Sequence, residues 1–188
     1  MIRYGVLVAL ILLSGCGSMP EKVKISGCLF PNSTDMAPEW VCDSDYDGLT
    51  LAAVGASIKM AEGPSVMRAT AAQAARIKLA NTITLQLQQV LQDSSDLTVD
   101  AMLFAQLFDG LITAETMIGS RIYTSRSAPD GGFYLLLGFE EQALRGMLGH
   151  VIFRSMQQKV ELWSISEDED AQRALNEQLV QQFMNMLK

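Results

Sequence analysis

The sequence predicts an α+β fold: a small, mainly antiparallel sheet of about three strands, packed by one long helix, with additional C-terminal helices. Three observations support this prediction. Alanine and aliphatic residues repeat at helical spacing through residues 66–92, an Asp-Gly turn separates two β-compatible runs, and two amphipathic stretches follow. The resulting order of strand, helix, hairpin and helices is typical of helices packed against a small sheet.

The first strand is expected over residues 49–59, which are small, apolar and β-compatible and precede Gly63-Pro64. Ser65 is then a suitable N-cap for a helix over residues 66–92. The alanines on one broad apolar face of this helix would let it approach a sheet closely. That face consists of Ala71, Ala72, Ala75, Leu79, Ile83 and Val90.

A second helix is predicted over residues 98–116, which are apolar around most of the helical girth. Residues 118–126 and 132–139 then flank Ala-Pro-Asp-Gly at 128–131, a strong signal for a β-hairpin. Alternation along the second strand of the hairpin places four side chains on one face, with Tyr134 and Leu136 opposite. These four are Phe133, Leu135, Leu137 and Phe139.

Two helices are predicted to complete the chain. Glu140 and Glu141 begin one that reaches about residue 158, with acids favourably placed at its N-terminus. Ser166 begins the other and forms a capping box with Glu169. Because this last helix follows an acidic break and is weakly charged, we expect its apolar stripe to bind a partner or a second copy. The stripe is Leu175, Leu179, Phe183 and Met186; the alternative is that the helix packs onto its own sheet.

The N-terminal residues 1–15 have the layout of a signal peptide. Their apolar run is too short to cross a bilayer core of about 30 Å, which needs about 20 helical residues. Leu13-Ser-Gly-Cys16 resembles the lipobox of bacterial lipoproteins, which implies cleavage before Cys16 and lipidation of that cysteine, palmitate included. Gly17 stands where an Asp commonly retains lipoproteins at the inner membrane, so the outer membrane is expected. Ordinary secretion is the alternative.

The mature chain is acidic. Residues 16–188 carry 13 basic and 21 acidic side chains, a formal charge of −8, because residues 1–15 contain Arg3 and no acid. Few Lys or Arg cluster, so composition excludes nucleic acid as a partner. No catalytic motif or phosphate-binding loop occurs in the sequence, so we expect no catalytic residue, no cofactor and no enzyme activity.

Residues 16–48 are predicted to form a tether that leads to a disulfide-closed loop, because Pro, Asn and Asp occur there without any regular period. Cys28 and Cys42 remain as an even pair once Cys16 carries lipid. A bridge between them would close a loop of about 15 residues, which the chain-entropy argument equates with roughly 3 kcal/mol. The alternatives are two separate thiols or a bridge between chains.

Asp43, Asp45 and Asp47 occupy positions 1, 3 and 5 of an EF-hand-like loop, with a glycine at position 6. Position 12 falls on Val54, so the bidentate Glu of such a loop is absent. We therefore expect a solvated acidic turn, with calcium as the weaker alternative, and predict no other metal site.

His150, the only histidine, lies on an apolar helix with no Cys, Asp or Glu cluster around it in the sequence. We therefore expect a packed or half-buried side chain rather than a metal ligand or a catalytic base. Trp40 and Trp163 are expected to cap the edge of the core, and the alternative is a pair of exposed anchors.

Several segments follow one another in a recognisable order. Residues 51–57 read Leu-Ala-Ala-Val-Gly-Ala-Ser, and residues 68–80 read Arg-Ala-Thr-Ala-Ala-Gln-Ala-Ala-Arg-Ile-Lys-Leu-Ala. The hairpin follows, with Ile-Gly-Ser-Arg-Ile-Tyr at 118–123 and Gly-Phe-Tyr-Leu-Leu-Leu-Gly-Phe at 132–139. In this order, after a lipobox, these motifs resemble the LPP20 lipoprotein family over residues 37–145.

The resemblance implies an LPP20-like α+β domain, which we place at residues 49–158, with the amphipathic helix at 166–188 outside the match. It further implies a non-catalytic outer-membrane lipoprotein that contacts proteins in the periplasm, as part of a flagellar or other envelope assembly. A ring component of a secretion system and a small-ligand-binding envelope module are the alternatives. The expected partners are the membrane, through the lipid, and proteins or further copies of the chain.

Overall fold

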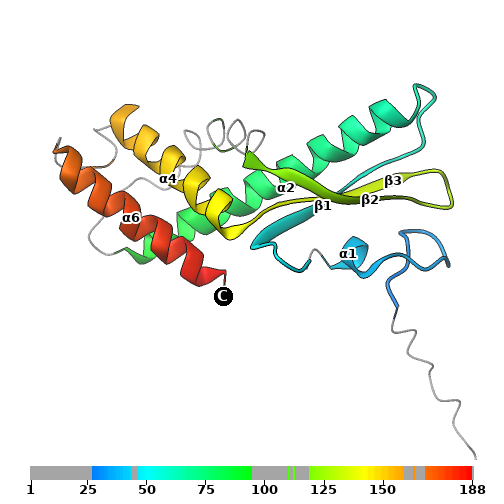
Figure 1. The fold of residues 1–188 in the computed structure, drawn as a ribbon, viewed down its shortest axis with the longest axis horizontal. Coiled ribbons are helices and arrows are strands. Elements are labelled where there is room, and N and C mark those ends of the chain that lie inside the picture. The colour runs from blue at the N-terminus through cyan, green and yellow to red at the C-terminus, as the bar shows by residue number, and fades with distance from the viewer. Residues whose placement is uncertain are drawn as a thin grey trace, which may run out of the picture.

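The computed structural model describes residues 27–43, 46–94, 110, 112, 119–158, 163 and 168–187. Over these residues the chain has an α+β fold, in which a three-stranded antiparallel sheet packs against a long helix and two C-terminal helices follow (Figure 1). The fold class predicted from the sequence is confirmed. None of the described helices is both long and apolar enough to span a membrane.

The sheet consists of β1 (Leu51–Ser57), β2 (Arg121–Ser127) and β3 (Phe133–Phe139), in the order β1-β3-β2. The central strand β3 pairs antiparallel with β1 over its whole length and with β2 over residues 133–138, and Val54 lies opposite Leu136. The register between β2 and β3 shifts between Ile122 and Thr124. Both β1 and β2 are therefore edge strands.

The predicted hairpin joins β2 to β3. The backbone N–H of Ala128 donates to the carbonyl of Gly132 over 2.8 Å, and the N–H of Gly131 donates to the carbonyl of Ala128 over 2.9 Å. Gly131 has a φ of 84°, and the carboxylate of Asp130 accepts a 2.8 Å hydrogen bond from the backbone of Gly132. The Asp-Gly pair thus supplies both the side-chain acceptor and the left-handed residue that this turn requires.

The long helix α2 (Pro64–Asp93) begins two residues earlier than expected, and the prediction that Ser65 is its N-cap is wrong. Gly63 occupies the N-cap with a φ of 94° and makes no side-chain capping bond. Pro64 follows at the start of the helix, where its fixed φ suits the first turn and its missing N–H costs no hydrogen bond. Backbone geometry, rather than a hydroxyl cap, therefore sets this boundary.

The two faces of the sheet contact different parts of the chain. One face of β3 joins the main core with α2, and its Leu135, Leu137 and Phe139 are fully buried there. On the opposite face, Tyr134 packs against Phe30 with ring centroids 5.5 Å apart. The predicted alternation along β3 is confirmed.

Residues 27–43 cover that second face of the sheet, so the folded part of the chain begins before residue 49. Their short helix α1 (Glu39–Cys42) contacts β3, and Figure 1 shows it across the sheet from α2. The disulfide between Cys28 and Cys42 ties the two ends of this segment together, with Cα atoms 5.7 Å apart. The predicted disulfide is thus present, and its loop packs on the sheet.

The C-terminal helices α4 (Glu141–Gln158) and α6 (Glu169–Met186) pack against each other, and α6 also contacts α2. In Figure 1 both lie beyond the end of the sheet, beside the far part of α2. Asp168 is the N-cap of α6, and its carboxylate accepts a 3.2 Å hydrogen bond from the backbone N–H of Asp170. The predicted cap at Ser166, a residue outside the described ranges, is therefore wrong.

The predicted helix at residues 98–116 lies outside the described residues, apart from Gly110 and Ile112. Ile112 is fully buried in the main core, as expected for an apolar segment. The strand predicted at 118–126 is observed as β2, which begins three residues later.

Candidate functional site

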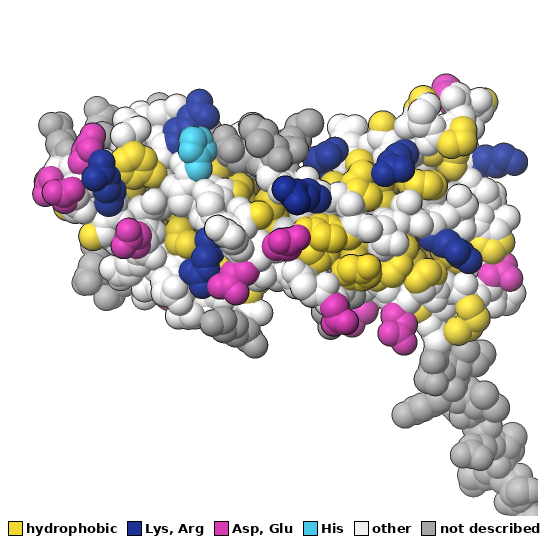
Figure 2. Space-filling model, viewed as in Figure 1, with side chains coloured by type: hydrophobic (Ala, Val, Ile, Leu, Met, Phe, Trp, Pro, Cys, Tyr) yellow, Lys and Arg dark blue, Asp and Glu magenta, His cyan; other side chains and the backbone are white. Residues whose placement is uncertain are grey.

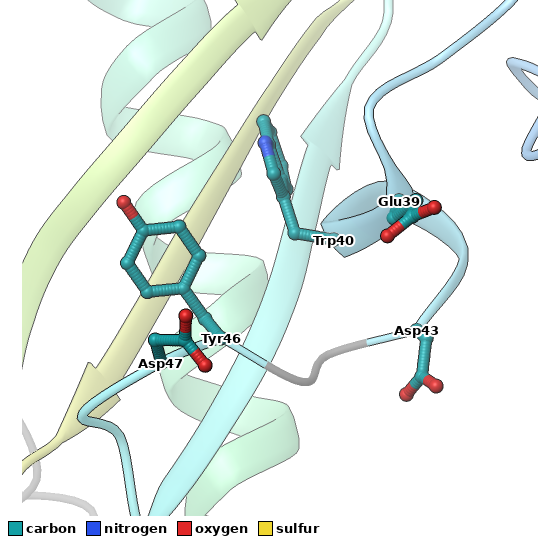
Figure 3. Close-up of a pocket in the computed structure, with 5 residues that line it drawn as sticks. All are labelled: Glu39, Trp40, Asp43, Tyr46 and Asp47. Carbon is teal, nitrogen blue, oxygen red and sulfur yellow. The ribbon is translucent and has the colours of Figure 1, made fainter.

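A cavity in the described part of the chain lies between α1 and the turn that leads into β1. Its volume is about 660 Å³, and five side chains line it. We call it the acidic recess; it is lined by Glu39, Trp40, Asp43, Tyr46 and Asp47 (Figure 3).

Local structure explains how these side chains come together. Pro38 precedes α1, and the single turn of this helix carries Glu39 and Trp40 on consecutive positions. On the other side, the backbone N–H of Leu49 donates to the carbonyl of Tyr46 over 3.0 Å, which closes a turn. The recess is therefore formed by two short segments that are close in sequence.

The sheet and the disulfide support both segments. The ring of Tyr46 lies 6.4 Å from that of Tyr123 on β2, measured between centroids. The disulfide to Cys28 fixes Cys42, the last residue of α1, and so holds this short helix beside the recess. These contacts tie the walls of the recess to the folded domain.

The recess combines negative charge with aromatic surface. Glu39, Asp43 and Asp47 contribute carboxylates, and none of the described residues that line the cavity is a Lys or Arg. Trp40 is only 8% exposed, whereas Tyr46 is 39% exposed. Figure 2 shows acidic side chains along the margin of the molecule on which α1 lies in Figure 1. The site is therefore suited to a cation rather than to an anion.

Two tyrosines of the sheet, Tyr123 and Tyr134, have raised pKa values. Burial raises the pKa of the Tyr123 phenol, and its 3.1 Å hydrogen bond to the carboxylate of Glu140 raises this pKa further. Burial also raises the pKa of Tyr134, with a smaller contribution from the charge of Asp130. Both phenols are therefore held in the neutral, proton-donating form.

Of the weak calcium candidates, Asp43 and Asp47 both line the acidic recess, whereas Asp45 lies outside the described residues. Among the residues that the structure describes, no group of three His, Cys, Asp or Glu side chains could hold a metal ion. Val54 lies within β1, opposite Leu136, so the position of the missing bidentate Glu belongs to the sheet.

The structure corrects the expectation of a docking stripe on the last helix. Leu179 and Phe183 are 1% and 0% exposed and belong to the main core, and the partly buried Leu175 packs against it. Met186 is the exception, at 38% exposed. The alternative prediction is that the helix packs onto its own sheet; α6 instead packs within the fold against the helices α4 and α2.

The remaining candidates are placed as follows. Cys16, the predicted lipidation site, lies outside the described residues. His150 is exposed on α4, so the expectation of a packed or half-buried side chain is wrong. Trp163 is 2% exposed and belongs to the main core.

Sequence reasoning missed the acidic recess, although a signal was present. Residues 39–47 interleave carboxylates with Trp40 and Tyr46, a composition that the calcium motif explains only in part. The recess became visible once α1 and the following turn were placed on the sheet. No protein-family model and no curated protein sequence match this chain.

Proposed function

We propose that this chain is a non-catalytic lipoprotein, held at the periplasmic face of the outer membrane by lipid on Cys16, that acts by contacting other proteins. The resemblance to the LPP20 family suggests a setting in a flagellar or other envelope assembly. The single structural observation that supports a binding role is the acidic recess, with its carboxylates and half-exposed Tyr46.

The position of the recess suits a membrane-tethered binding protein. Only ten residues separate Cys16 from Gly27, where the described part of the chain begins. At full extension this linker reaches at most about 40 Å. A lipid on Cys16 would thus hold Gly27, where the described part of the chain begins, within about 40 Å of the membrane surface.

Substitution of Cys16 tests the anchor. Cys16→Ser should move the protein from the membrane to the soluble periplasmic fraction and abolish incorporation of labelled palmitate, because lipid is the only anchor found in the sequence. Ser18→Ala, which leaves the lipobox-like residues intact, is the control and should stay with the membrane. A Cys16→Ser protein that remains on the membrane after a salt wash would contradict the proposal.

Site-specific cross-linking in intact cells tests the contact with proteins. A photoreactive amino acid at Tyr46 should give covalent adducts with another envelope protein, because this position lies at the acidic recess. The same amino acid at Glu177, an exposed position on α6, should not give these adducts. Equal yields at both positions would indicate non-specific proximity and contradict a binding role for the recess.

A further inference from the structure

We propose that the free edge of β1 binds residues 21–26 of the same chain as a fourth strand of the sheet. This segment immediately precedes the described fold, and its sequence is Glu-Lys-Val-Lys-Ile-Ser. The proposal goes beyond the proposed function and does not depend on the lipid. Three features support it: a groove beside β1, the point at which the chain enters the fold, and the match of side chains on the two sides.

The first argument is the free edge itself. β3 pairs with one edge of β1, and no strand in the described part of the chain pairs with the opposite edge. A groove of about 430 Å³ lies between α1 and α2, and none of its described lining residues belongs to β3 or β2. We call it the edge groove; it is lined by Val41 and Cys42 of α1, by residues 52–54 of β1, and by the side of α2 that carries Lys78 and Thr82. Because the edge of a strand can template a further strand, the groove suits an extended segment.

The backbone of β1 can be reached from this groove. The Nζ of Lys78 donates a 2.7 Å hydrogen bond to the carbonyl of Val54, so a side chain outside the sheet already contacts this backbone oxygen. Ala52 and Ala53 carry only methyl groups, which let another backbone approach closely. One lysine serves a single carbonyl, whereas an added strand would bond to several backbone groups along the edge.

The second argument is the place where the chain enters the fold. Cys28 is bonded to Cys42, with Cα atoms 5.7 Å apart, and Cys42 lines the edge groove. The segment that ends at Ser26 therefore begins two residues from a half-cystine whose partner lines the groove. Six extended residues span about 20 Å, close to the length of the seven-residue β1. Attachment gives this segment an effective concentration at the groove that a second copy or a separate peptide lacks.

The third argument is the match of side chains. In an added strand, Val23 and Ile25 would lie on one face. Lys22 and Lys24 would lie on the opposite face. The α2 side of the groove offers apolar surface, because Leu85 is 66% exposed and lies one helical turn after the lining residues of α2. This side therefore suits the face that carries Val23 and Ile25.

Charge matches on the other side of the sheet. Glu39 and Asp43 are exposed at the two ends of α1, which also lines the groove. In Figure 3 both carboxylates lie on the side of β1 that faces away from β3. When the apolar face meets α2, Lys22 and Lys24 point toward these acids. The reverse orientation would bring both lysines toward Lys78 and is disfavoured.

Docking of this segment would shorten the tether. With residues 21–26 on the sheet, only residues 17–20 separate Cys16 from the fold. The reach of the tether from Cys16 then falls from about 40 Å to about 18 Å at full extension. A lipid on Cys16 would hold the sheet correspondingly closer to the membrane.

Amide hydrogen exchange, followed by nuclear magnetic resonance on the full chain carrying Cys16→Ser, tests the proposal. Every second amide of residues 21–26 should exchange at least about tenfold more slowly than in a free peptide of the same sequence, because alternate N–H groups of an edge strand bond to its neighbour. Nuclear Overhauser contacts should join this segment to residues 52–56. Light scattering should give the mass of a monomer, and the protection should not depend on protein concentration.

Matched variants locate the two binding surfaces. Val23→Asp with Ile25→Asp should reduce the protection to less than about twofold, because charged groups replace the apolar face. Leu85→Gln should reduce it about threefold through loss of apolar contact at the groove. Val66→Gln removes a 40% exposed apolar side chain from the start of the same helix and should leave the protection unchanged. Unchanged amide signals of α4 and α6 confirm that each variant is folded.

Several outcomes would overturn the proposal: unprotected amides in residues 21–26, or protection that both the paired Asp substitutions and Leu85→Gln leave unchanged. A dimer whose protection falls on dilution would overturn it in favour of a segment donated by a second copy. These results are separable from failure of the proposed function, because the membrane fractionation and the cross-linking at Tyr46 do not depend on a fourth strand.

Discussion

Gly55 lies on β1 where this strand packs against α2. A Cβ atom at this position would collide with the backbone carbonyl of Ala71 and lie within 2.8 Å of the backbone nitrogen of Ala75. Both alanines are fully buried, and β1 and α2 are in extensive contact. Small residues on both sides therefore set the distance between the sheet and the helix, as the alanine-rich face predicted.

We expect Gly55→Ala to lower the free energy of unfolding by about 1–3 kcal/mol, because the added methyl group meets backbone atoms that cannot rotate away. Ala56→Val is the control, since it adds more volume at the exposed neighbouring position and should change stability by less than about 0.5 kcal/mol. Urea unfolding measures both changes. Equal stabilities of Gly55→Ala and wild type would show that the helix shifts freely to make room.

Tyr123 gives a pH-dependent prediction. Its pKa is raised first by burial and then by Glu140, so folding favours the protonated phenol. The resulting stability is fully present below the ordinary tyrosine pKa of about 10 and is lost as the pH rises through the raised value. Glu140→Gln should lower the pKa of Tyr123 without restoring the ordinary value, because burial remains.

Absorbance titration of each protein against its Tyr123→Phe counterpart isolates this phenol. Tyr134 is the internal control, because its pKa is raised by burial and Asp130 and should not respond to Glu140→Gln. A Tyr123 pKa that does not change in the Glu140 variant would contradict the contribution of the carboxylate.

At the scale of elements, the start of α6 shows how a local motif can be assigned to the wrong residue. Ser166 and Glu169 have the spacing of a capping box, but Asp168 caps the helix and Glu169 is its first residue. Four consecutive acids precede or begin this helix, so more than one residue has cap chemistry. The spacing of these residues does not identify the N-cap, because its position depends on where the chain enters the helix after α4.

Asp168→Ala should destabilise the fold by about 1 kcal/mol through loss of the N-cap. Asp168→Asn should restore most of this stability, because Asn caps a helix about as well as Asp. Ser166→Ala should leave stability unchanged. Thermal unfolding of the three variants decides between the two caps, and a larger effect of the Ser166 substitution would favour the capping box after all.

The elements of the sheet and the long helix could be predicted because each carries a regular period that burial enforces. Alternation along β3 and the alanine face of α2 are examples. Residues 27–43 have no such period, since their contacts with the sheet come from irregular backbone, one turn of helix and a disulfide. The disulfide could be predicted from the cysteine count, whereas the packing of its loop and the acidic recess could not.

On the scale of the whole molecule, α2 joins the sheet to the C-terminal helices. Its 30 residues contact β1, β3 and α6, and one continuous core runs from the sheet to the buried side of α6. The amphipathic pattern of α6 indicated an apolar stripe but not its occupant, because a partner and the chain's own core require the same periodicity. The occupant of the stripe follows from the position of α2. The C-terminal part of α2 extends beyond the sheet, and α6 covers it there (Figure 1).

Substitution within the stripe of α6 tests whether this helix completes the core. Phe183→Ala should lower the free energy of unfolding by about 3–5 kcal/mol, because the fully buried ring leaves a cavity among α2, α4 and α6. Met186→Ala, at a position 38% exposed on the same helix, should cost less than about 1 kcal/mol. Truncation after Ile165 should lower the thermal midpoint sharply for the same reason. A truncated chain that kept its midpoint but lost oligomeric mass in light scattering would return α6 to the role of a docking helix.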